Sequence, residues 1–183
     1  MATVYQHLKK AQNTGSGVAD AFYFAPIEAF AADGIKCPTP PVPPATATLA
    51  DKVTITEDHE FVATNGFIKV VTAPFKNQIT AQSIGEPGSQ KFNQSLEVFV
   101  PGSYAELHGT MALLNNAACI VLIKDSACEA GNYYQLGCDC LFAWATAEFG
   151  TGTTRDGQKG YKVTFSYPTD AILTYKGAVP EQV

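Results

Sequence analysis

The segment from Tyr161 to Tyr167 alternates strictly between large apolar and polar side chains. Its apolar members are Tyr161, Val163, Phe165 and Tyr167, and its polar members are Lys162, Thr164 and Ser166. Because successive side chains of a strand point to opposite faces, this pattern predicts a β-strand with one face in the core and the other face outward. Loop-forming residues from Gly150 to Gly157 come before it, so we expect it to be the second arm of a hairpin.

Other strand-like segments recur along the chain, each bounded by turn residues. They are Phe22–Ile27, Val53–Ile55, Phe67–Val71, Gln78–Ile84, Lys91–Val100, Cys119–Ile123, Tyr133–Leu136, Cys140–Phe149 and Ile172–Tyr175. Pro26 restricts the first of them to the edge of a sheet or to a strand end. The dipeptide Asn65-Gly66, just before Phe67, is typical of a hairpin turn.

Two of these strands are expected to be prominent in the core. In Lys91–Val100, the side chains of Leu96, Val98 and Val100 share one face, and those of Glu97 and Phe99 the other. Cys119–Ile123 is continuously apolar, which is typical of a central strand buried on both faces.

One segment has helical rather than strand spacing. Tyr104, Leu107, Met111 and Leu114 recur every three or four residues, which predicts one apolar stripe on a helix of about three turns. Ser103 and Glu106 match a capping box at its start, and Asn115-Asn116 ends it. We expect this helix to lie against the sheet, so the fold class is mainly β with one flanking α-helix, of the β-sandwich or half-barrel kind.

The length of 183 residues suits one domain with extensions. We expect an N-terminal arm at residues 1–20, a β-rich domain at 21–177 and a tail at 178–183. Residues 37–51 are expected to form a proline-rich loop, either as a spacer between strands or as a recognition segment for an aromatic groove. With 46% hydrophobic and 16% charged residues the chain can form a core, and its weakly charged surface suits burial against neighbours.

The charge pattern argues against two functions. Acidic side chains number 17 and basic ones 12, and Arg155 is the only arginine, so a sequence-specific nucleic-acid reader is not expected. The longest apolar run, Ala118–Ile123, is too short to span a bilayer. The first residues lack the pattern of a secretory signal, so we expect synthesis in the cytosol and five reduced cysteines without a disulfide.

Few residues suggest chemistry. His59 lies among acidic residues from Glu57 to Glu60, where a metal or acid–base site competes with the favoured interpretation of an exposed acidic turn. His108 is expected to border the helical stripe.

The cysteines do not show the spacing of a zinc site. Cys138 and Cys140 would lie on a strand, without the tight turn of a zinc knuckle, although four thiolates including Cys119 and Cys128 could in principle hold zinc. Nucleophile-elbow and phosphate-loop motifs are absent from the sequence. We therefore expect no catalytic residue, no metal and no cofactor, and a protein that is not an enzyme.

The order of elements from Val53 to Gly177 resembles that of the major tail tube protein of long-tailed bacteriophages. The matching segments are Asp58-His-Glu-Phe61 with Gly66-Phe67, Ser83-Ile-Gly-Glu-Pro-Gly-Ser-Gln-Lys-Phe92, Phe99-Val-Pro-Gly102, Ile120-Val-Leu-Ile-Lys-Asp125, Tyr133-Tyr-Gln-Leu-Gly137, Phe149-Gly-Thr-Gly152 and Gly160-Tyr-Lys-Val163 through Tyr175-Lys-Gly177. The resemblance covers about two thirds of the chain and is one of arrangement. The proline-rich loop and the five cysteines depart from the pattern.

The resemblance implies a virion structural protein whose subunits close into hexameric rings with a β-barrel lumen. Stacked rings would form a channel that conducts DNA without sequence-specific binding, and the partners would be other copies, a tape-measure protein and a tail terminator. Such a protein would be made in the host cytoplasm and reside in the virion tail. The inner tube of a contractile injection system and a non-viral β-sandwich binding module are the alternatives.

Two groups of residues are expected to serve assembly. The arm at 1–20 and the segment Ala32–Asp51 would order against the adjacent ring through the anchors Val4, Tyr5, Leu8 and Val42. Deleting either segment is expected to leave the melting of the fold unchanged and to abolish tube growth. Lys162, Thr164 and Ser166 are short or polar and would face outward, as the inner wall of a tube requires.

Overall fold

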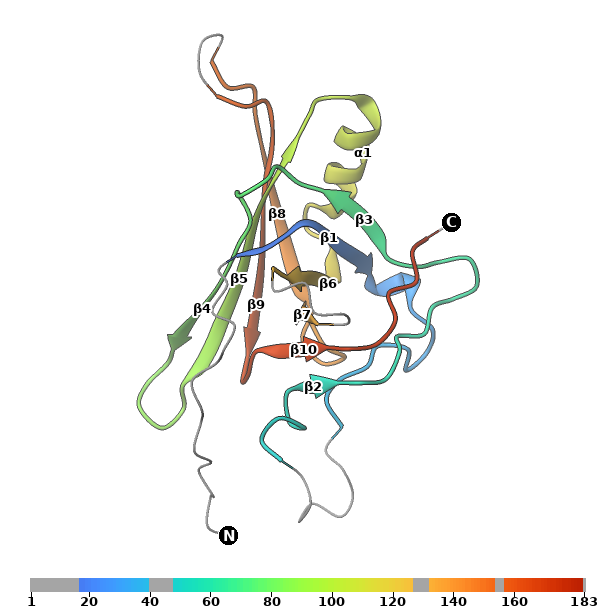
Figure 1. Cartoon of the computed structure of the whole chain (residues 1–183), viewed down its shortest axis with the longest axis vertical. Helices are drawn as coiled ribbons and strands as arrows, with labels where there is room; N and C mark the ends of the chain where they lie inside the picture. The colour runs from blue at the N-terminus through green and yellow to red at the C-terminus, as the bar shows by residue number, and fades with distance from the viewer. Residues whose placement is uncertain (1–16, 40–47, 127–131, 154–156, 183) are drawn as a thin grey trace.

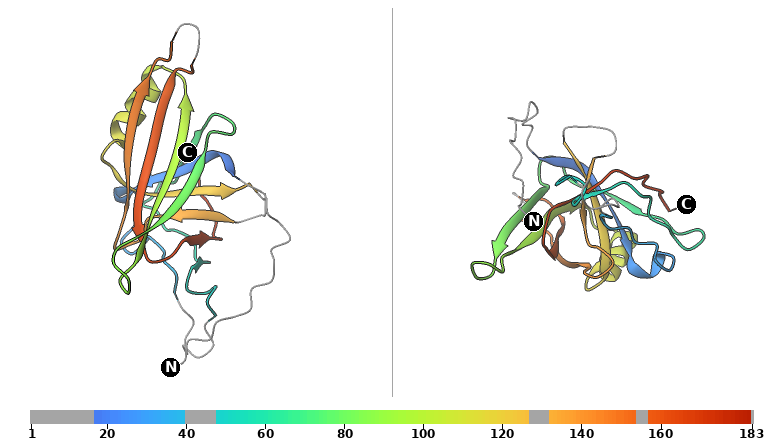
Figure 2. Two further views of the ribbon diagram at one scale, coloured as in Figure 1. Left: turned by 90° about the vertical axis from the view of Figure 1, so that its left-hand side faces the viewer. Right: turned by 90° about the horizontal axis from the view of Figure 1, so that it is seen from below.

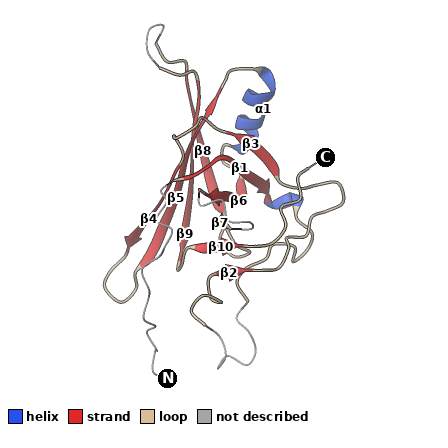
Figure 3. Ribbon diagram, in the orientation of Figure 1, coloured by secondary structure: helices blue, strands red, loops and turns tan. Residues whose placement is uncertain are grey.

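A computed structural model describes residues 17–39, 48–126, 132–153 and 157–182 of the chain. Within these ranges the strands are β1 Val18–Pro26, β2 Thr54–Ile55, β3 Ile68–Val71, β4 Gln78–Ile84, β5 Lys91–Pro101, β6 Ala118–Asp125, β7 Tyr133–Leu136, β8 Ala143–Gly150, β9 Gly160–Thr169 and β10 Leu173–Tyr175. A 3-10 turn, η1, spans Ile27–Ala29, and the α-helix α1 spans Ala105–Leu114. Figure 3 shows how strands dominate the fold. The expectation of a mainly β fold with one α-helix is therefore confirmed.

All the strands belong to one open, mixed sheet. Its hydrogen-bonded order is β2-β10-β7-β6-β8-β9-β5-β4, with β1 pairing β6 and β3 pairing β1. The β10–β2 pair is parallel, whereas the other pairs are antiparallel. Cys119 pairs with Pro26 of β1 and with Ala143 of β8, and Val121 pairs with Phe24 of β1 and with Leu136 of β7. Because β1 occupies one edge of β6, β7 and β8 share the opposite edge and the sheet forks there.

The fork divides the sheet into two arrays that cross in space. The long strands β8, β9, β5 and β4 run together along the tall axis of the molecule, and β1, β6, β7, β10 and β2 run across them (Figure 1; Figure 2, left). The core fills the angle between the arrays, where the rings of Phe22 and Phe165 meet edge to face at 5.3 Å between centroids. The five residues of Cys119–Ile123 are each 0% exposed, so the prediction of a strand buried on both faces is confirmed.

The helix confirms its predicted stripe only in part. Leu107, Met111 and Leu114 are buried, but Tyr104 is 57% exposed and stands at the N-cap. The cap has no side-chain hydrogen bond, so the predicted capping box is wrong. The Ser103 hydroxyl bonds instead to Nε2 of His108 at 3.2 Å, because the ring lies within reach on the first turn.

The helix contacts the sheet at β8, as expected. Its end is fixed by two asparagines: the amide of Asn116 donates to the carbonyl of Ala145 at 3.2 Å, and Oδ1 of Asn115 accepts from the amide of Ala147 at 3.2 Å. Asn116 adopts a left-handed φ of 66°, which ends the helical path. These two bonds use backbone groups of β8 at Ala145 and Ala147, just after Trp144, the last residue of β8 that pairs with β6.

The Asn65-Gly66 hairpin prediction is wrong. The strand that follows, β3, pairs with β1, whereas the short β2 before it pairs with β10. Gly66 is instead packed against the C-terminal segment, where an added Cβ would lie 2.8 Å from the Pro180 carbonyl oxygen. The glycine is needed for this close approach of two chain segments.

Of the described residues, none belongs to a helix long and apolar enough to cross a membrane.

Candidate functional site

The candidate assembly surface is the outward side of β8, β9, β5 and β4, which we call the outer face. Its cross-strand rows follow from the register: Thr164 lies between Thr146 and Glu97, and Ser166 lies between Trp144 and Ser95. Lys162 lies between Glu148 and Phe99. Strand β4 extends the rows with Gln78, Thr80 and Gln82. Three of the residues predicted for assembly thus share one face of the four-stranded array.

The opposite side of β9 fixes this orientation. Val163 and Phe165 are 0% exposed and Tyr167 is 3% exposed, so their burial forces the intervening residues outward. The predicted alternation is confirmed, with one refinement at Tyr161, which is only half-buried. Its hydroxyl bonds to Nδ1 of His108, so the aromatic ring links the strand to the helix.

The outer face is polar and its charges are partly paired. Nζ of Lys162 lies 3.1 Å from Oε2 of Glu97, and both side chains are about half exposed, so the pair stabilises the fold by less than about 1 kcal/mol. Nζ of Lys76 lies 4.9 Å from the centre of the Phe99 ring, a cation–π geometry. The remaining residues of the rows are Ser, Thr and Gln, together with Glu148 and the exposed Trp144. The outer face therefore has few unpaired Lys or Arg side chains to which DNA phosphates could bind.

Strand β4 is an edge of the sheet. Within the described part of the chain it pairs only with β5, so every second residue of β4 directs its amide and carbonyl away from the sheet. Near its end, Ile84 is 46% exposed and Phe92 of β5 is 38% exposed. An edge with free backbone groups and nearby apolar side chains is suited to pairing with another chain.

The other residues predicted for assembly are placed differently. Val4, Tyr5, Leu8 and Val42 lie outside the described residues. The start of Ala32–Asp51 is not an appendage, because Gly34 exchanges backbone hydrogen bonds with neighbours that include Glu60. Deletion of the whole segment would therefore damage the fold, contrary to the expectation above.

His59 is buried rather than exposed, with 4% of its surface accessible. Its ring stacks on Tyr175 at 4.7 Å and meets the rings of Phe30 and Phe67 edge to face. The prediction of an exposed turn is therefore wrong at this residue. Glu57, Asp58 and Glu60 are exposed as predicted. The physical reason is that this irregular segment follows no strand period, and aromatic residues from distant segments enclose the imidazole.

Both nitrogens of His59 are hydrogen-bonded in a way that requires the neutral ring. Nδ1 accepts from the amide of Lys36 at 3.1 Å, so Nε2 carries the hydrogen and donates to Oε1 of Gln135 at 3.0 Å. The amide nitrogen of Gln135 donates to the carbonyls of Gly137 and Lys36, which orients its oxygen toward the imidazole. Burial lowers the pKa of His59, and the bond to Gln135 opposes that shift only in part. The ring fastens the segment before residue 39 to β7.

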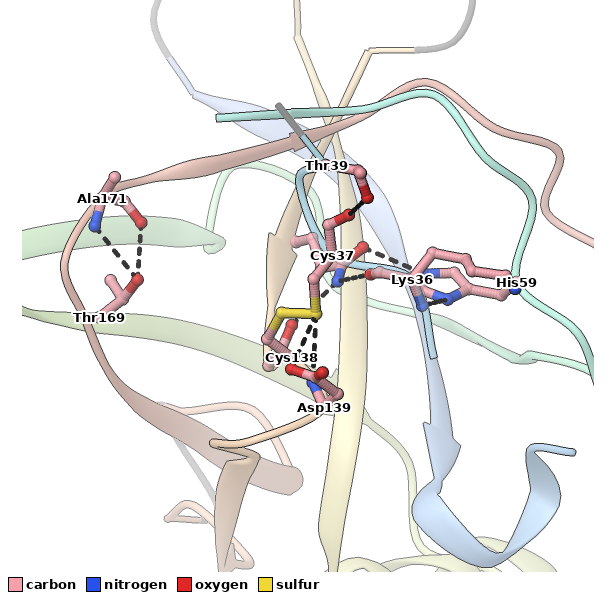
Figure 4. The surroundings of a disulfide bond; sticks show 10 residues. Lys36, Cys37, Thr39, His59, Cys138, Asp139, Thr169 and Ala171 are labelled. Atoms are coloured by element: carbon pink, nitrogen blue, oxygen red, sulfur yellow. Dashed lines mark hydrogen bonds between the residues drawn. A yellow bond between two sulfur atoms is a disulfide. The ribbon is translucent and has the colours of Figure 1, made fainter. Parts of the chain in front are cut away.

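A second cluster contains sulfur. Cys37 and Cys138 form a disulfide with 5.8 Å between their Cα atoms, and it links segments 101 residues apart (Figure 4). The expectation of five reduced thiols without a disulfide is therefore wrong, because spacing along the chain says nothing about two cysteines that meet only after folding. Cys119 is buried and free, and burial raises its pKa to about 12, which makes it an inert thiol as expected.

The turn after β7 carries three residues of this cluster. The amide of Cys138 donates to the carbonyl of Leu141 at 2.7 Å, closing a tight loop, and Gly137 begins it with a left-handed φ of 102°. The amide of Asp139 donates to Sγ of Cys37 at 3.2 Å, and its Oδ1 lies at the same distance from that sulfur. Cys140 is free and exposed, and its hydrogen bond to Asp139 raises its pKa.

A cavity of about 430 Å³ opens beside the disulfide. It is lined in part by Asp33, Glu57 and Asp139, with Lys36 as the basic residue of the lining. Nζ of Lys36 is paired with Glu60 at 2.8 Å, so the lining is acidic on balance. Among the described residues, the donor atoms of Cys37, Cys138 and Asp139 come within 4.8 Å of one another. No sequence motif marks this group, since Cys37 lies 101 residues before Cys138.

Comparison of the chain with protein-family models, with curated proteins and with solved structures found no match.

Proposed function

We propose that this protein is the tail tube subunit of a long-tailed bacteriophage, a virion structural protein that assembles with copies of itself into stacked, hexameric rings. The observation that carries the proposal is the outer face: four long strands present a polar, weakly charged surface next to a strand edge that has no partner among the described residues. The arrangement of sequence segments described above supports the same assignment. The tube would reside in the virion tail after assembly in the host cytoplasm.

The outer face has the properties required of a channel wall. DNA carries a dense negative charge, so a wall rich in unpaired Lys or Arg would hold it and resist its passage. The residues beside Thr164 and Ser166 are Thr146, Ser95, Glu97 and the exposed Trp144, and the carboxylate of Glu97 is paired with Lys162. The chain's net charge of −5 acts in the same direction. DNA would therefore slide through the lumen without sequence-specific binding.

Closure of the ring would use the edge at β4. In an isolated subunit, the edge amides and carbonyls of β4 that have no partner within the described ranges would favour uncontrolled association. Pairing this edge with a strand of the next subunit would satisfy those groups and would bury Ile84 and Phe92, which are exposed in the single chain. Obligate interfaces bury on the order of 2,000 Å² or more, so the assembly would be much more stable than its monomer. The tape-measure and terminator proteins would set the length of such a tube.

This function requires no catalytic group, and the protein would not be an enzyme. The burial of two potentially reactive side chains supports that view: His59 is enclosed, and Cys119 is buried with a raised pKa. Both are poor candidates for general-base or nucleophilic roles.

Electron microscopy and native mass spectrometry of the purified protein at high concentration test the proposal. We expect sixfold rings or tubes for the unmodified protein and none for Thr164→Pro. However, β9 has partners on both edges, so this proline removes a ladder donor whichever neighbour accepts it. The carbonyl that loses this donor would by itself lower the free energy of unfolding by about 1–3 kcal/mol, so the substitution also destabilises the monomer.

A pair of variants in β4 separates assembly from folding. Along an edge strand, neighbouring residues alternate in directing their amides toward the sheet and away from it. One of the two variants Thr80→Pro and Ala81→Pro therefore removes a backbone hydrogen bond to β5 and should lower the melting temperature. The other variant removes only an amide that points away from the sheet. We expect the variant with the smaller loss of stability to remain monomeric. Normal tubes from that variant, or a strictly monomeric unmodified protein even when its tail partners are co-expressed, would refute the proposal.

A further inference from the structure

The cysteine cluster offers more than a covalent crosslink. We propose that in the reduced protein Cys37, Cys138 and Asp139 bind a zinc ion, which then takes over from the disulfide in holding residues 35–39 to the turn at 137–141. The inference is independent of the proposed assembly into tubes. It concerns a metal site formed by two chain segments that the Cys37–Cys138 bond joins when oxidised.

The first support is the placement of the donor atoms. Two sulfurs and one carboxylate oxygen lie within 4.8 Å of one another. Zinc binds thiolates at about 2.3 Å and carboxylate oxygens at about 2.0–2.2 Å, so a single ion between these atoms is within reach of all three after small side-chain rotations. Cys37 and Cys138 are half-buried and Asp139 is exposed, so a metal ion can enter from solvent.

The second support is the tight turn. Zinc knuckles use a turn that directs two ligands to one ion, and the absence of such a turn was the sequence argument against zinc. In the structure Cys138 begins a closed loop, with its amide donating to Leu141. The backbone amide of Asp139 also points at Sγ of Cys37 at 3.2 Å, and such N–H donors stabilise the negative charge of a thiolate. The folded chain therefore forms a tight turn that the spacing of the cysteines did not indicate.

The third support is the surrounding charge and the supply of a further ligand. The neighbouring cavity carries Asp33 and Glu57, and its one lining lysine is paired with Glu60, so the field favours a cation. Asp139 is exposed, so a water molecule from solvent would complete a four-coordinate site. Binding converts two thiols into thiolates and releases two protons to the solvent.

The test is a zinc titration of the whole protein after reduction with a phosphine and removal of the reductant without oxygen. Competition with a chromophoric chelator should show stoichiometric zinc in the reduced protein and none in the oxidised protein. Cys37→Ser should abolish stoichiometric binding, and Asp139→Asn should weaken it by about 10–100-fold. The matched control, Cys119→Ala, removes a buried thiol outside the cluster and should leave binding unchanged.

A second measurement needs no variant and so does not depend on how a variant folds. Zinc should slow the alkylation of Cys37 and Cys138 in the reduced native protein, as mapped by peptide mass spectrometry. Cobalt should give a thiolate charge-transfer band that oxidation removes. Reduced protein that takes up no stoichiometric zinc, or that binds zinc equally well with Cys37→Ser, would overturn the proposal and leave the pair as a disulfide alone.

Discussion

Lowering the pH below about 6.5 should destabilise this protein through His59. In the folded chain Nδ1 of this residue accepts a hydrogen bond from the Lys36 amide. Protonation of Nδ1 would therefore place two hydrogen-bond donors against each other. His59 is only 4% exposed, and this removal from water disfavours the cation further. Burial is the main reason that its pKa lies below the ordinary value of 6.5.

The sign follows from proton binding in the two states. The pKa of His59 is lower in the folded chain than in the unfolded chain. Below pH 6.5 the unfolded chain therefore binds more protons at His59 than the folded chain does, so acid favours unfolding. The stabilisation is complete above the ordinary pKa and is lost as the pH falls toward the lowered pKa. For one proton the loss is at most about 1.4 kcal/mol per pH unit. Against a typical total of about 5–15 kcal/mol, one unit is measurable by denaturant unfolding.

The assay is urea unfolding at intervals between pH 8 and pH 5, with His59→Phe as the control. Phenylalanine fits the aromatic surroundings but leaves the Lys36 amide and the Gln135 oxygen unpaired. Its free energy of unfolding should therefore be lower by about 1–3 kcal/mol for each stranded group, and this loss should not depend on pH. The wild type should lose stability more steeply than the variant below pH 6.5. Equal slopes for the two proteins would refute the assignment of a buried, neutral His59.

Three further experiments test a disulfide, a hydrogen bond and a buried ring. Cys37→Ser should lower the free energy of unfolding of the oxidised protein by about 2–5 kcal/mol, because the disulfide with Cys138 closes a long loop, and an unchanged urea midpoint would contradict this. Ser103→Ala should cost about 0.5–1.5 kcal/mol by removing the bond to His108, and combining it with His108→Ala should show non-additivity in thermal melts. Phe165→Ala should cost about 3–5 kcal/mol as measured by calorimetry, since the ring is wholly buried.

The local patterns of the sequence determined where the strands lie. The bounds of β4 and β7 agree with the segments Gln78–Ile84 and Tyr133–Leu136 expected from the sequence. The outward orientation of Thr164 was also predictable, because burial of alternate residues fixes the faces of a strand. The outer face of the sheet could therefore be anticipated at β9, where the period of two is strict.

Capping and turn chemistry were less reliable, because they compete with contacts from distant residues. Ser103 matched a cap motif, yet its hydroxyl bonds to His108, which in turn is held by Tyr161. Asn65-Gly66 matched a hairpin turn, yet the strands on its two sides pair elsewhere. In each case a local preference of about 1 kcal/mol gave way to tertiary packing.

Strand pairing, the buried His59 cluster and the sulfur cluster were decided only by the tertiary structure. The parallel β10–β2 pair, the enclosure of His59 by Gln135 and the Cys37–Cys138 link all join segments far apart in the chain. Side-chain periodicity reports which face of an element is buried, and it carries no information on which distant element covers that face. The sequence by itself determined a β-rich chain with a polar strand face, and long-range packing decided how the sheet forks and where its chemistry gathers.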